Sequence, residues 1–301
     1  MNRINHTTEA HVESNGIRIA YDTFGDPLHR PVVLIQGLNM QMIAWEIEFC
    51  RSLAARGNYV IRFDNRDVGH TTWCSEAGIP DLAELMQSAL EGKPVKAPYN
   101  LKDMAADTVG LLDGLGIEKA HVAGVSMGGM IAQTMAIYYP QRISSMTSIM
   151  STTGNPSLPG PTPEAQRVLF TPPPEEREAY IESRIELWQI LSGPGAQIDV
   201  EHIRRREAMF YDRGMNPAAP VRQLAAIMAS GNRRPMLEKV NIPALVIHGD
   251  IDPLLPLACA RDTADAIPGA KLKIIKGMGH NLDAMPQAWE EVIDAIQENI
   301  E

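Results

Sequence analysis

Short runs of apolar and β-branched residues alternate with segments of helical periodicity along most of this chain. The runs predict strands over residues 31–36, 59–64, 120–124, 143–150, 244–248 and 271–275. The intervening segments predict helices over residues 44–56, 103–115, 127–139, 257–266 and 286–300. This alternation is typical of an α/β protein with a mostly parallel, twisted sheet and helices on both faces. Asn15-Gly16 separates two further runs, over 11–14 and 17–24, which predicts a β-hairpin near the start of the chain.

A long segment interrupts the alternation between the strands over 143–150 and 244–248. A plain crossover between parallel strands needs only about a dozen residues. This segment opens with a loop rich in proline and continues with helical patterns over 175–191, 200–213 and 219–230. Because the sheet pattern resumes afterwards, we expect one core domain built from residues 1–150 and 243–301, with residues 151–242 inserted as a helical lid. A shorter insertion over 77–100 is expected to hold one helix, over 80–91.

The composition favours a soluble protein with a well-buried core, since 45% of its 301 residues are hydrophobic. The formal net charge is −10. The only compact basic run, Arg204–Arg206, predicts a solvated helix face, so nucleic acid is not expected as a ligand. No apolar stretch approaches the ~20 residues of a membrane span, and the polar first residues lack the apolar core of a signal peptide. The cysteines are too scattered for a disulfide framework or a zinc site: Cys50, Cys74 and Cys259. We therefore expect a cytoplasmic protein without a cofactor or a metal.

A serine stands between two glycines where the strand over 120–124 meets the helix over 127–139. The motif is Gly124-Val-Ser126-Met-Gly128. Small flanking residues permit a tight turn there, because a Cβ at either position would collide with adjacent backbone. Such a turn holds the serine hydroxyl clear of the sheet at a helix amino-terminus, where backbone amides can face a developing oxyanion. The motif indicates a nucleophilic Ser126, rather than a glycine-rich turn that only packs the helix on the strand.

A serine hydroxyl needs a general base near neutral pH, and the chain has eight histidines. His121 lies inside a strand and His248 ends one, which are positions typical of packed residues. His70 follows the loop over 64–69, where an ordinary loop role is favoured over a place at the border of the pocket. His280 differs, because it follows Gly-Met-Gly in the loop between the last strand and the last helix. Ligands and catalytic groups gather in such loops in open α/β sheets, so we predict that His280 is the base.

Two acids compete to orient this histidine, both in the segment His248-Gly-Asp-Ile-Asp-Pro253. Asp250, nearer the strand, could accept hydrogen bonds from the backbone amides of its own turn. Asp252 precedes a proline that favours an extended backbone, so its side chain can reach a neighbouring loop. The strand over 143–150 is followed by Ser-Thr-Thr-Gly, which offers no carboxylate. We favour Asp252 over Asp250.

With its order of serine, acid and histidine, its glycine-flanked serine and its lid insertion, the chain resembles the α/β-hydrolase superfamily over nearly its whole length. The segments that carry the resemblance are Gln36-Gly37-Leu38-Asn39 and residues 64–69, 124–129, 249–252 and 277–280. Many members of the superfamily have His-Gly where this chain has Gln36-Gly37. Within the superfamily the chain is most similar to the esterases resembling aclacinomycin methylesterase, through residues 120–128 and the lid segment 188–193.

The resemblance implies a carboxylic ester hydrolase that needs no cofactor. The family's oxyanion hole would be formed here by the backbone amides of Leu38 and Met127, whose apolar side chains would be free to shape the acyl pocket. His280 would take the proton of Ser126 as its oxygen attacks an ester carbonyl, and would then protonate the leaving alcohol. Water would release the acid from the acyl-enzyme. A dehalogenase or an epoxide hydrolase of this fold would carry aspartate in place of the serine.

The expected substrate is a medium-sized, largely apolar small-molecule ester, with a methyl ester of a polycyclic natural product as one case. Flexible methionines near the site either adapt to such a ligand or pack the core: Met40, Met42, Met127, Met130 and, in the lid, Met209. One or two of four aromatic residues are expected to touch it: Trp45, Trp188, Phe210 and Tyr211.

Two other functions are compatible with the same residues. A carbon–carbon bond hydrolase, a lactonase or a cofactor-free haloperoxidase would keep the three catalytic residues and change the substrate. A non-catalytic ligand-binding receptor would keep only the fold, and it has less need of an intact serine, acid and histidine. The esterase is therefore the favoured hypothesis.

Overall fold

The computed structural model describes residues 4–284 and 286–301. Within these residues eight strands form one sheet, in the order β1-β2-β4-β3-β5-β6-β7-β8. The strands are β1 (His6–Ser14), β2 (Ile17–Phe24), β3 (Arg30–Ile35), β4 (Asn58–Phe63), β5 (Ala120–Val125), β6 (Ile143–Ile149), β7 (Ala244–Gly249) and β8 (Lys271–Ile275). β2 pairs antiparallel with β1 and with β4, and every other neighbouring pair is parallel. The prediction of a mostly parallel sheet is confirmed.

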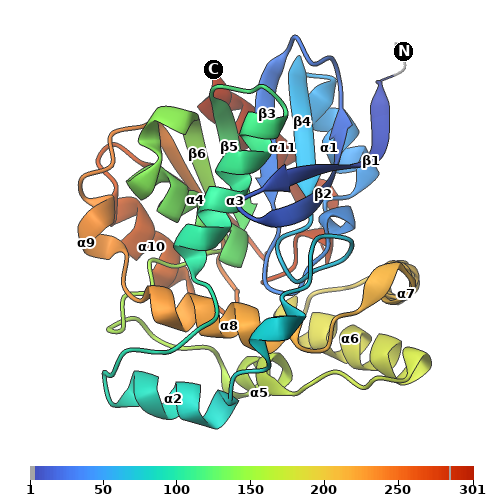
Figure 1. Cartoon of the computed structure of the whole chain (residues 1–301), viewed down its shortest axis with the longest axis vertical. Helices are drawn as coiled ribbons and strands as arrows, with labels where there is room; N and C mark the ends of the chain where they lie inside the picture. The colour runs from blue at the N-terminus through green and yellow to red at the C-terminus, as the bar shows by residue number, and fades with distance from the viewer. Residues whose placement is uncertain (1–3, 285) are drawn as a thin grey trace.

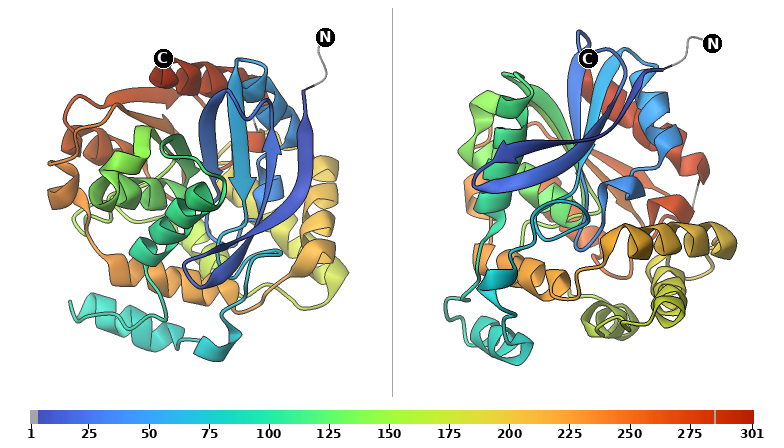
Figure 2. Two further views of the ribbon diagram at one scale, coloured as in Figure 1. Left: turned by 45° about the horizontal axis from the view of Figure 1, so that its top comes forward. Right: turned by 45° about the vertical axis from the view of Figure 1, so that its right-hand side comes forward.

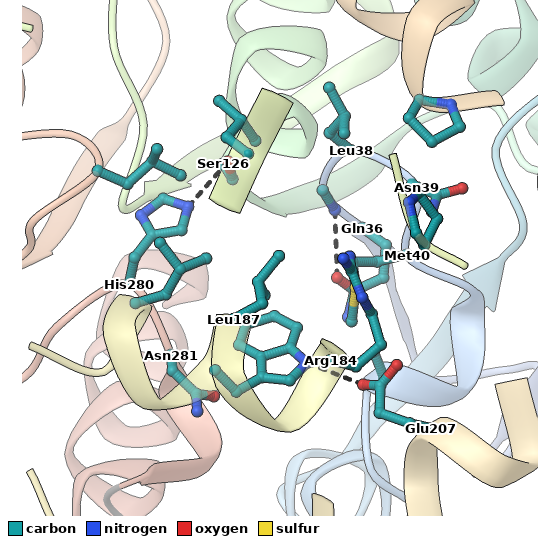
Figure 3. A pocket seen from close by; sticks show the side chains of 18 of the residues that line it. Gln36, Leu38, Asn39, Met40, Ser126, Arg184, Leu187, Glu207, His280 and Asn281 are labelled. Carbon is teal, nitrogen blue, oxygen red and sulfur yellow. Dashed lines mark hydrogen bonds between the residues drawn. The ribbon is translucent and has the colours of Figure 1, made fainter. Parts of the chain in front are cut away.

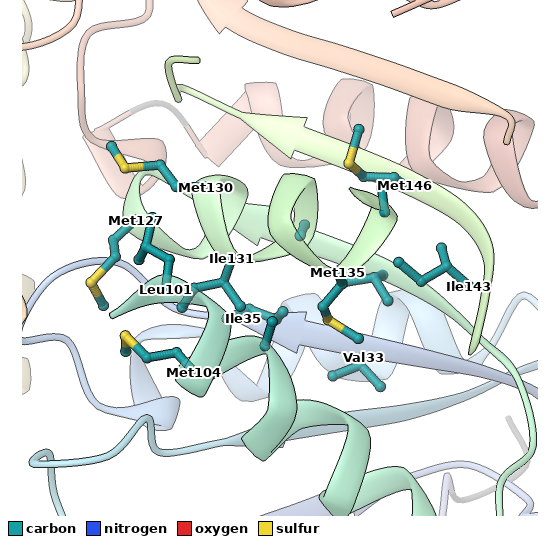
Figure 4. Close-up of a cluster of buried hydrophobic side chains, with 14 of the residues drawn as sticks. Val33, Ile35, Leu101, Met104, Met127, Met130, Ile131, Met135, Ile143 and Met146 are labelled. Atoms are coloured by element: carbon teal, nitrogen blue, oxygen red, sulfur yellow. The ribbon is translucent and has the colours of Figure 1, made fainter. Parts of the chain in front are cut away.

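Helices cover both faces of the sheet (Figure 1). One face carries α1 (Ile47–Ala54) and α11 (Pro286–Ile300), and the other carries α3 (Leu101–Gly114), α4 (Met127–Tyr138) and α10 (Leu257–Ala266). Val32 and Leu34 of β3 lie in the core beside α1 and α11. Val33 and Ile35 point the other way, into the core beside α3 and α4 that Figure 4 shows. Because β3 is buried on both faces, its sequence is apolar without alternation.

The predicted hairpin is confirmed, and its turn residues Asn15 and Gly16 both adopt positive φ, at 49° and 78°. Its first strand begins at His6, earlier than the pattern over 11–14 predicts. The shorter insertion holds one α-helix, α2 (Leu82–Leu90), which Asp81 caps. The part of the chain that the structure describes also holds four short 3₁₀ helices in its loops: η1 (Met42–Ala44), η2 (Ser75–Ala77), η3 (Pro140–Arg142) and η4 (Leu282–Ala284). No helix of the described ranges has the length and apolar character needed to cross a bilayer.

The segment between β6 and β7 is helical, and Figure 2 shows its main helices gathered beyond one end of the sheet. Its helices are α5 (Pro163–Phe170), α6 (Arg177–Leu191), α7 (Val200–Gly214), α8 (Ala219–Ser230) and α9 (Arg234–Leu237). α6, α7 and α8 confirm the predicted patterns, whereas α5 and α9 fall where the sequence predicts no helix. In α5, Pro163 takes the first helical position, where its missing N–H costs no intrahelical hydrogen bond, and Thr162 caps the helix.

The prediction of a solvated basic face at 204–206 is wrong for Arg206. Arg206 is only 4% exposed and lies on the buried face of α7 together with Ile203 and Phe210. Residues three and four positions apart share one face of a helix, so the third arginine of the run turns inward. Arg205 is exposed, on the outer side of the same helix.

A buried ion pair anchors α8 to the sheet domain. The Nε and Nη2 atoms of Arg222 donate to the two carboxylate oxygens of Asp67, at 2.9 and 2.7 Å. The hydroxyl of Tyr99 donates to the same carboxylate at 2.6 Å. Both members of the pair are almost completely buried, with Asp67 at 0% and Arg222 at 2% exposure. This pair therefore fixes one helix of the inserted segment to the loop that follows β4.

We expect Arg222→Met to lower the free energy of unfolding by about 3 to 5 kcal/mol, because it leaves the Asp67 carboxylate buried without its cation. Urea unfolding at neutral pH measures this loss. The exposed pair of Arg204 with Glu182 supplies the matched control, since Arg204→Met should leave the free energy of unfolding nearly unchanged. Equal losses in the two variants would contradict an anchoring role for the buried pair.

Candidate active site

Ser126 occupies a sharp turn between β5 and α4. Its backbone has φ 52° and ψ −117°, a conformation that residues with a side chain rarely adopt. A Cβ on Gly124 would lie 2.1 Å from the carbonyl oxygen of Gly128, and one on Gly128 would lie 2.2 Å from that of Ile35. Neither position has room for a side chain, which is the steric reason that the sequence analysis gave for the two glycines. The turn places the serine at the amino-terminal end of α4.

The side chains of Ser126, His280 and Asp252 lie in one hydrogen-bonded chain. His280 Nε2 is 3.0 Å from Ser126 Oγ, and His280 Nδ1 is 2.7 Å from Asp252 Oδ2. The three residues follow β5, β8 and β7, which are parallel strands that end at the same edge of the sheet. Figure 3 shows the serine and the histidine facing each other across this edge. The structure thus brings together the three side chains that the sequence analysis selected.

The Asp252 carboxylate is buried and held from two sides. Its Oδ1 accepts the backbone N–H groups of Leu254 and Leu255, both at 2.9 Å. Burial raises the pKa of this carboxyl, but the neighbouring rings of His280 and His248 more than offset that effect and hold its pKa well below its ordinary value. Asp252 is therefore ionised at neutral pH, as an acid that orients an imidazole must be.

Asp250 has a different role from the one that its position suggests. It is exposed, and its Oδ1 accepts the N–H of Gly277 at 2.5 Å, in the turn after β8. Its position predicted that it would bind the amides of its own turn, which Asp252 does instead. Asp250 thereby fixes the start of the loop that carries His280, and it has no direct contact with the imidazole.

Other histidines have the packing roles expected of them. His121 Nδ1 lies 2.8 Å from Ser145 Oγ, and His248 Nε2 donates to the carbonyl of Leu255 at 2.7 Å. His70 is bonded to Glu9 at an exposed position. Among the histidines of the described ranges, only His280 lines the large cavity beside Ser126.

The loop after β3 lies directly against Ser126. A Cβ on Gly37 would be 3.3 Å from the Cβ of Ser126, so the following residue, Leu38, is close to the serine as well. The described residues supply no hydrogen-bond acceptor to the amide of Leu38 or of Met127, and the latter is the first residue of α4. Both amides are thus available to an oxyanion, and their role stays a prediction. The side chains of both residues were expected to shape the acyl pocket. Leu38 lines the cavity, whereas Met127 is packed in the core.

A residue of α8 fixes this loop. Gln223 is fully buried, and its Oε1 accepts the N–H of Asn39 at 2.7 Å while its Nε2 donates to the carbonyl of Arg66 at 3.0 Å. Asn39 has φ 58°, so the loop bends sharply at the residue that Gln223 holds. Inside the loop, Gln36 Oε1 accepts the N–H of Gly37 at 3.1 Å. Sequence reasoning missed Gln223, which stands 184 positions away from its partner.

We expect Gln223→Met to lower kcat about tenfold with little change in KM, because an unanchored loop no longer holds the Leu38 amide in place for the transition state. Steady-state kinetics on an aryl ester measures the effect, with active sites counted by organophosphate titration so that misfolded enzyme does not contribute. An unchanged kcat per titrated site would show that the contact of Gln223 with Asn39 only stabilises the fold.

A cavity of about 200 Å³ opens beside Ser126 and His280, between the edge of the sheet and helices α5–α8. Apolar side chains form most of its wall, including Leu38, Met40, Leu187, Leu224 and Leu254. Of the aromatic candidates, Trp45 and Trp188 line the cavity, and Phe210 and Tyr211 do not. Among the methionines considered, Met40 lines it, whereas Met127 and Met130 pack in the core and Met209 is exposed.

A polar group lies in the cavity wall, and the sequence analysis did not find it. Glu207, only 1% exposed, accepts the indole N–H of Trp188 at 2.8 Å and a guanidinium N–H of Arg206 at 3.1 Å. Arg206 also pairs with Asp283 of η4. The available signal was helical spacing, because residues 206 and 207 fall three and four positions after Ile203 on the apolar face of α7.

One group of side chains in the described ranges has a geometry compatible with a metal ion. Ligand atoms of Glu46, His202 and Asp283 lie within 4.8 Å of one another. His202 Nε2 is bonded to Glu46 at 3.1 Å, and Asp283 is paired with Arg206, so both carboxylates already have cationic or hydrogen-bonding partners. Burial raises the pKa of both carboxyls. This cluster joins α7 to the start of α1 and to η4.

Comparison with known proteins places these features in context. A family model described as alpha/beta hydrolase fold matches residues 30–194. The chain is 30% identical to the rhodomycin D methylesterase of Streptomyces peucetius, over 94% of this chain and 95% of that protein. It is 31% identical to the rhodomycin D methylesterase of Streptomyces sp. strain C5, over 90% of each. The structure of 2-hydroxy-6-oxo-6-phenylhexa-2,4-dienoate hydrolase from Rhodococcus sp. strain RHA1 superposes with a TM-score of 0.76 at 19% identity, over 99% of both chains, which shows the shared fold.

Proposed function

Because this chain belongs to the alpha/beta hydrolase fold family, we propose that it is a serine carboxylesterase in which Ser126, His280 and Asp252 form the catalytic triad. The observation that carries the proposal is the hydrogen-bonded chain from Ser126 Oγ through the imidazole to a buried carboxylate, at 3.0 and 2.7 Å. A nucleophile, a base and an orienting acid in this arrangement are what acyl transfer requires.

The proposed reaction proceeds in two halves. Ser126 Oγ attacks the ester carbonyl while His280 Nε2 takes its proton, and the amides of Leu38 and Met127 stabilise the oxyanion. His280 then protonates the leaving alcohol. In the second half, the imidazole takes a proton from water, which attacks the acyl-enzyme and releases the acid from Ser126.

The proposed substrate is a medium-sized, largely apolar ester. The cavity wall supports this because most of it is apolar, and the two curated relatives are named for a methyl ester of rhodomycin D. We therefore propose the methyl ester of a polycyclic natural product as the favoured substrate class. Residues 151–242 would act as the lid, because α5–α8 supply the part of the wall that faces the sheet.

A substrate panel and a covalent label test this proposal together. The values of kcat/KM are compared for short-chain and medium-chain aryl esters, a lactone, and a substrate in which a carbon–carbon bond is hydrolysed. An ester should be the best substrate, and an organophosphate should label Ser126 stoichiometrically as judged by peptide mass spectrometry. Preferred turnover of the lactone or the carbon–carbon substrate would reassign the reaction while keeping the triad. Absence of both labelling and turnover would favour a non-catalytic receptor.

A further inference from the structure

Arg184 differs from the other charged residues of the cavity because the described residues give it no polar partner. It lies on the face of α6 that lines the cavity, with Tyr180, Leu187 and Trp188 three or four positions away. Its Nε is buried and has no hydrogen-bond acceptor. The ring of Tyr180 lies beside it, with its centroid 5.7 Å from the guanidinium carbon.

The two carboxylates in this part of the cavity wall, Glu207 and Asp283, are paired with Arg206. Arg206 donates to Glu207 and pairs with Asp283, and neither acid forms an ion pair with Arg184 in the described residues. Arg184 as a whole is half-buried, and the cost falls on its Nε, because a buried donor without an acceptor is unfavourable. A ligand bound in the cavity would supply the missing acceptor.

The position of Arg184 defines what that ligand is. Figure 3 shows its side chain reaching into the cavity on the side away from Ser126 and His280. An ester that fills this part of the cavity from a carbonyl at Ser126 would extend past Leu187 towards the guanidinium. Guanidinium groups bind carboxylates and other anionic oxygens through paired N–H donors.

We propose that Arg184 binds an anionic oxygen of the substrate, so that the preferred esters carry a second, acidic group at the end remote from the scissile bond. Two sources of that oxygen share this chemistry, a carboxylate and an ionised phenol or enol. The kinetic test of this inference rests on the proposed esterase function, whereas its binding test does not.

The kinetic test uses matched pairs of methyl esters of increasing chain length. One series ends in a carboxylate and is compared with its neutral carboxamide, and the other ends in an ionised nitrophenol and is compared with its methyl ether. For wild type we expect kcat/KM of the anionic member to exceed that of its neutral partner at least about tenfold at one length. The series with the larger ratio identifies the source of the oxygen.

Arg184→Met should reduce this ratio to about 1, because methionine keeps an unbranched side chain without the donors. Arg205→Met is the matched control, since it removes the same charge from the neighbouring helix α7 at an exposed position outside the cavity wall, and it should keep the wild-type ratio. No preference at any length, or an equal loss in both variants, would overturn the proposal.

The binding test uses calorimetry to measure the affinity of Ser126→Ala for the two members of each pair, one with the anionic group at the remote end and one with its neutral counterpart. Tighter binding of the anionic analogue that disappears in Ser126→Ala/Arg184→Met supports the inference even if the protein hydrolyses no ester. Equal affinities in the two proteins contradict it, even if wild type is an active esterase. Failure of the inference is thus distinguishable from failure of the proposed function.

Discussion

Replacing Ser126 by alanine is expected to lower kcat for ester hydrolysis about 10⁶-fold, the size of loss that follows removal of the serine from a triad. The variant keeps the cavity and the backbone amides of Leu38 and Met127, so it should still bind substrate and retain a small rate above that of water. Hydrolysis of a chromogenic aryl ester measures the loss. A variant within about tenfold of wild type would place the nucleophile elsewhere.

The double variant Ser126→Ala/His280→Ala sharpens this test. Because the serine and the histidine act as one unit, removal of both should cost no more than removal of the serine alone. Thermal unfolding of the variants serves as the control for folding, since Ala also carries a Cβ and therefore keeps the same backbone strain at φ 52°. Losses that multiply would show that Ser126 and His280 do not share one step.

Asp252→Asn is expected to lower kcat about 10⁴-fold while the fold is retained. The carboxylate accepts the N–H of His280 Nδ1 at 2.7 Å, and this bond keeps Nε2 free to take the serine proton. An amide in its place can present its N–H₂ group to the ring and stabilise the wrong tautomer. Measurement of kcat at saturating ester between pH 6 and 9 separates this loss from a shift in the working pH.

Asp250→Asn is the matched control for this variant. Its side chain is exposed and bonds only the Gly277 amide among the described residues, so kcat should fall less than about tenfold. A larger effect from Asp250 than from Asp252 would reverse the choice between them.

The stability of the fold in acid provides a second comparison. Because the folded-state pKa of Asp252 is lowered, its ionisation stabilises the fold above about pH 4, and this contribution is lost as the pH falls further. Asp252→Asn should lack that part of the acid sensitivity.

For Asp250 and Asp252, the sequence predicted one contact correctly and one incorrectly. Proline after Asp252 correctly pointed to the acid that contacts the neighbouring loop. The same reasoning assigned the amides of the turn to Asp250, whereas Asp252 accepts two of them with its other oxygen. A carboxylate can serve two sets of partners at once, and turn chemistry considered one residue at a time does not reveal it.

Local sequence patterns did not settle the positions of Met127 and Arg206, although the spacing from Ile203 was a signal for Arg206. The methionine beside the nucleophile was compatible with the pocket or with the core, and the arginine in a basic run was expected to be solvated. In the structure Met127 packs in the core and Arg206 is buried against Glu207. Which side of a helix faces the interior depends on the element against which it packs, and that element is distant in the chain.

The sequence by itself determined the order of the strands and of the helices that pack on the sheet, the turn at Ser126 and the region from which the base and the acid come. These follow from periodicity and from backbone sterics, which act between residues close together in the chain. Only the tertiary structure decided that Gln223 holds the loop at Asn39 and that Arg206 pairs with both acids of the cavity wall. It also decided that Arg184 has no polar partner among the described residues. Contacts of this kind join residues far apart in sequence, and they depend on how the inserted helices pack onto the edge of the sheet.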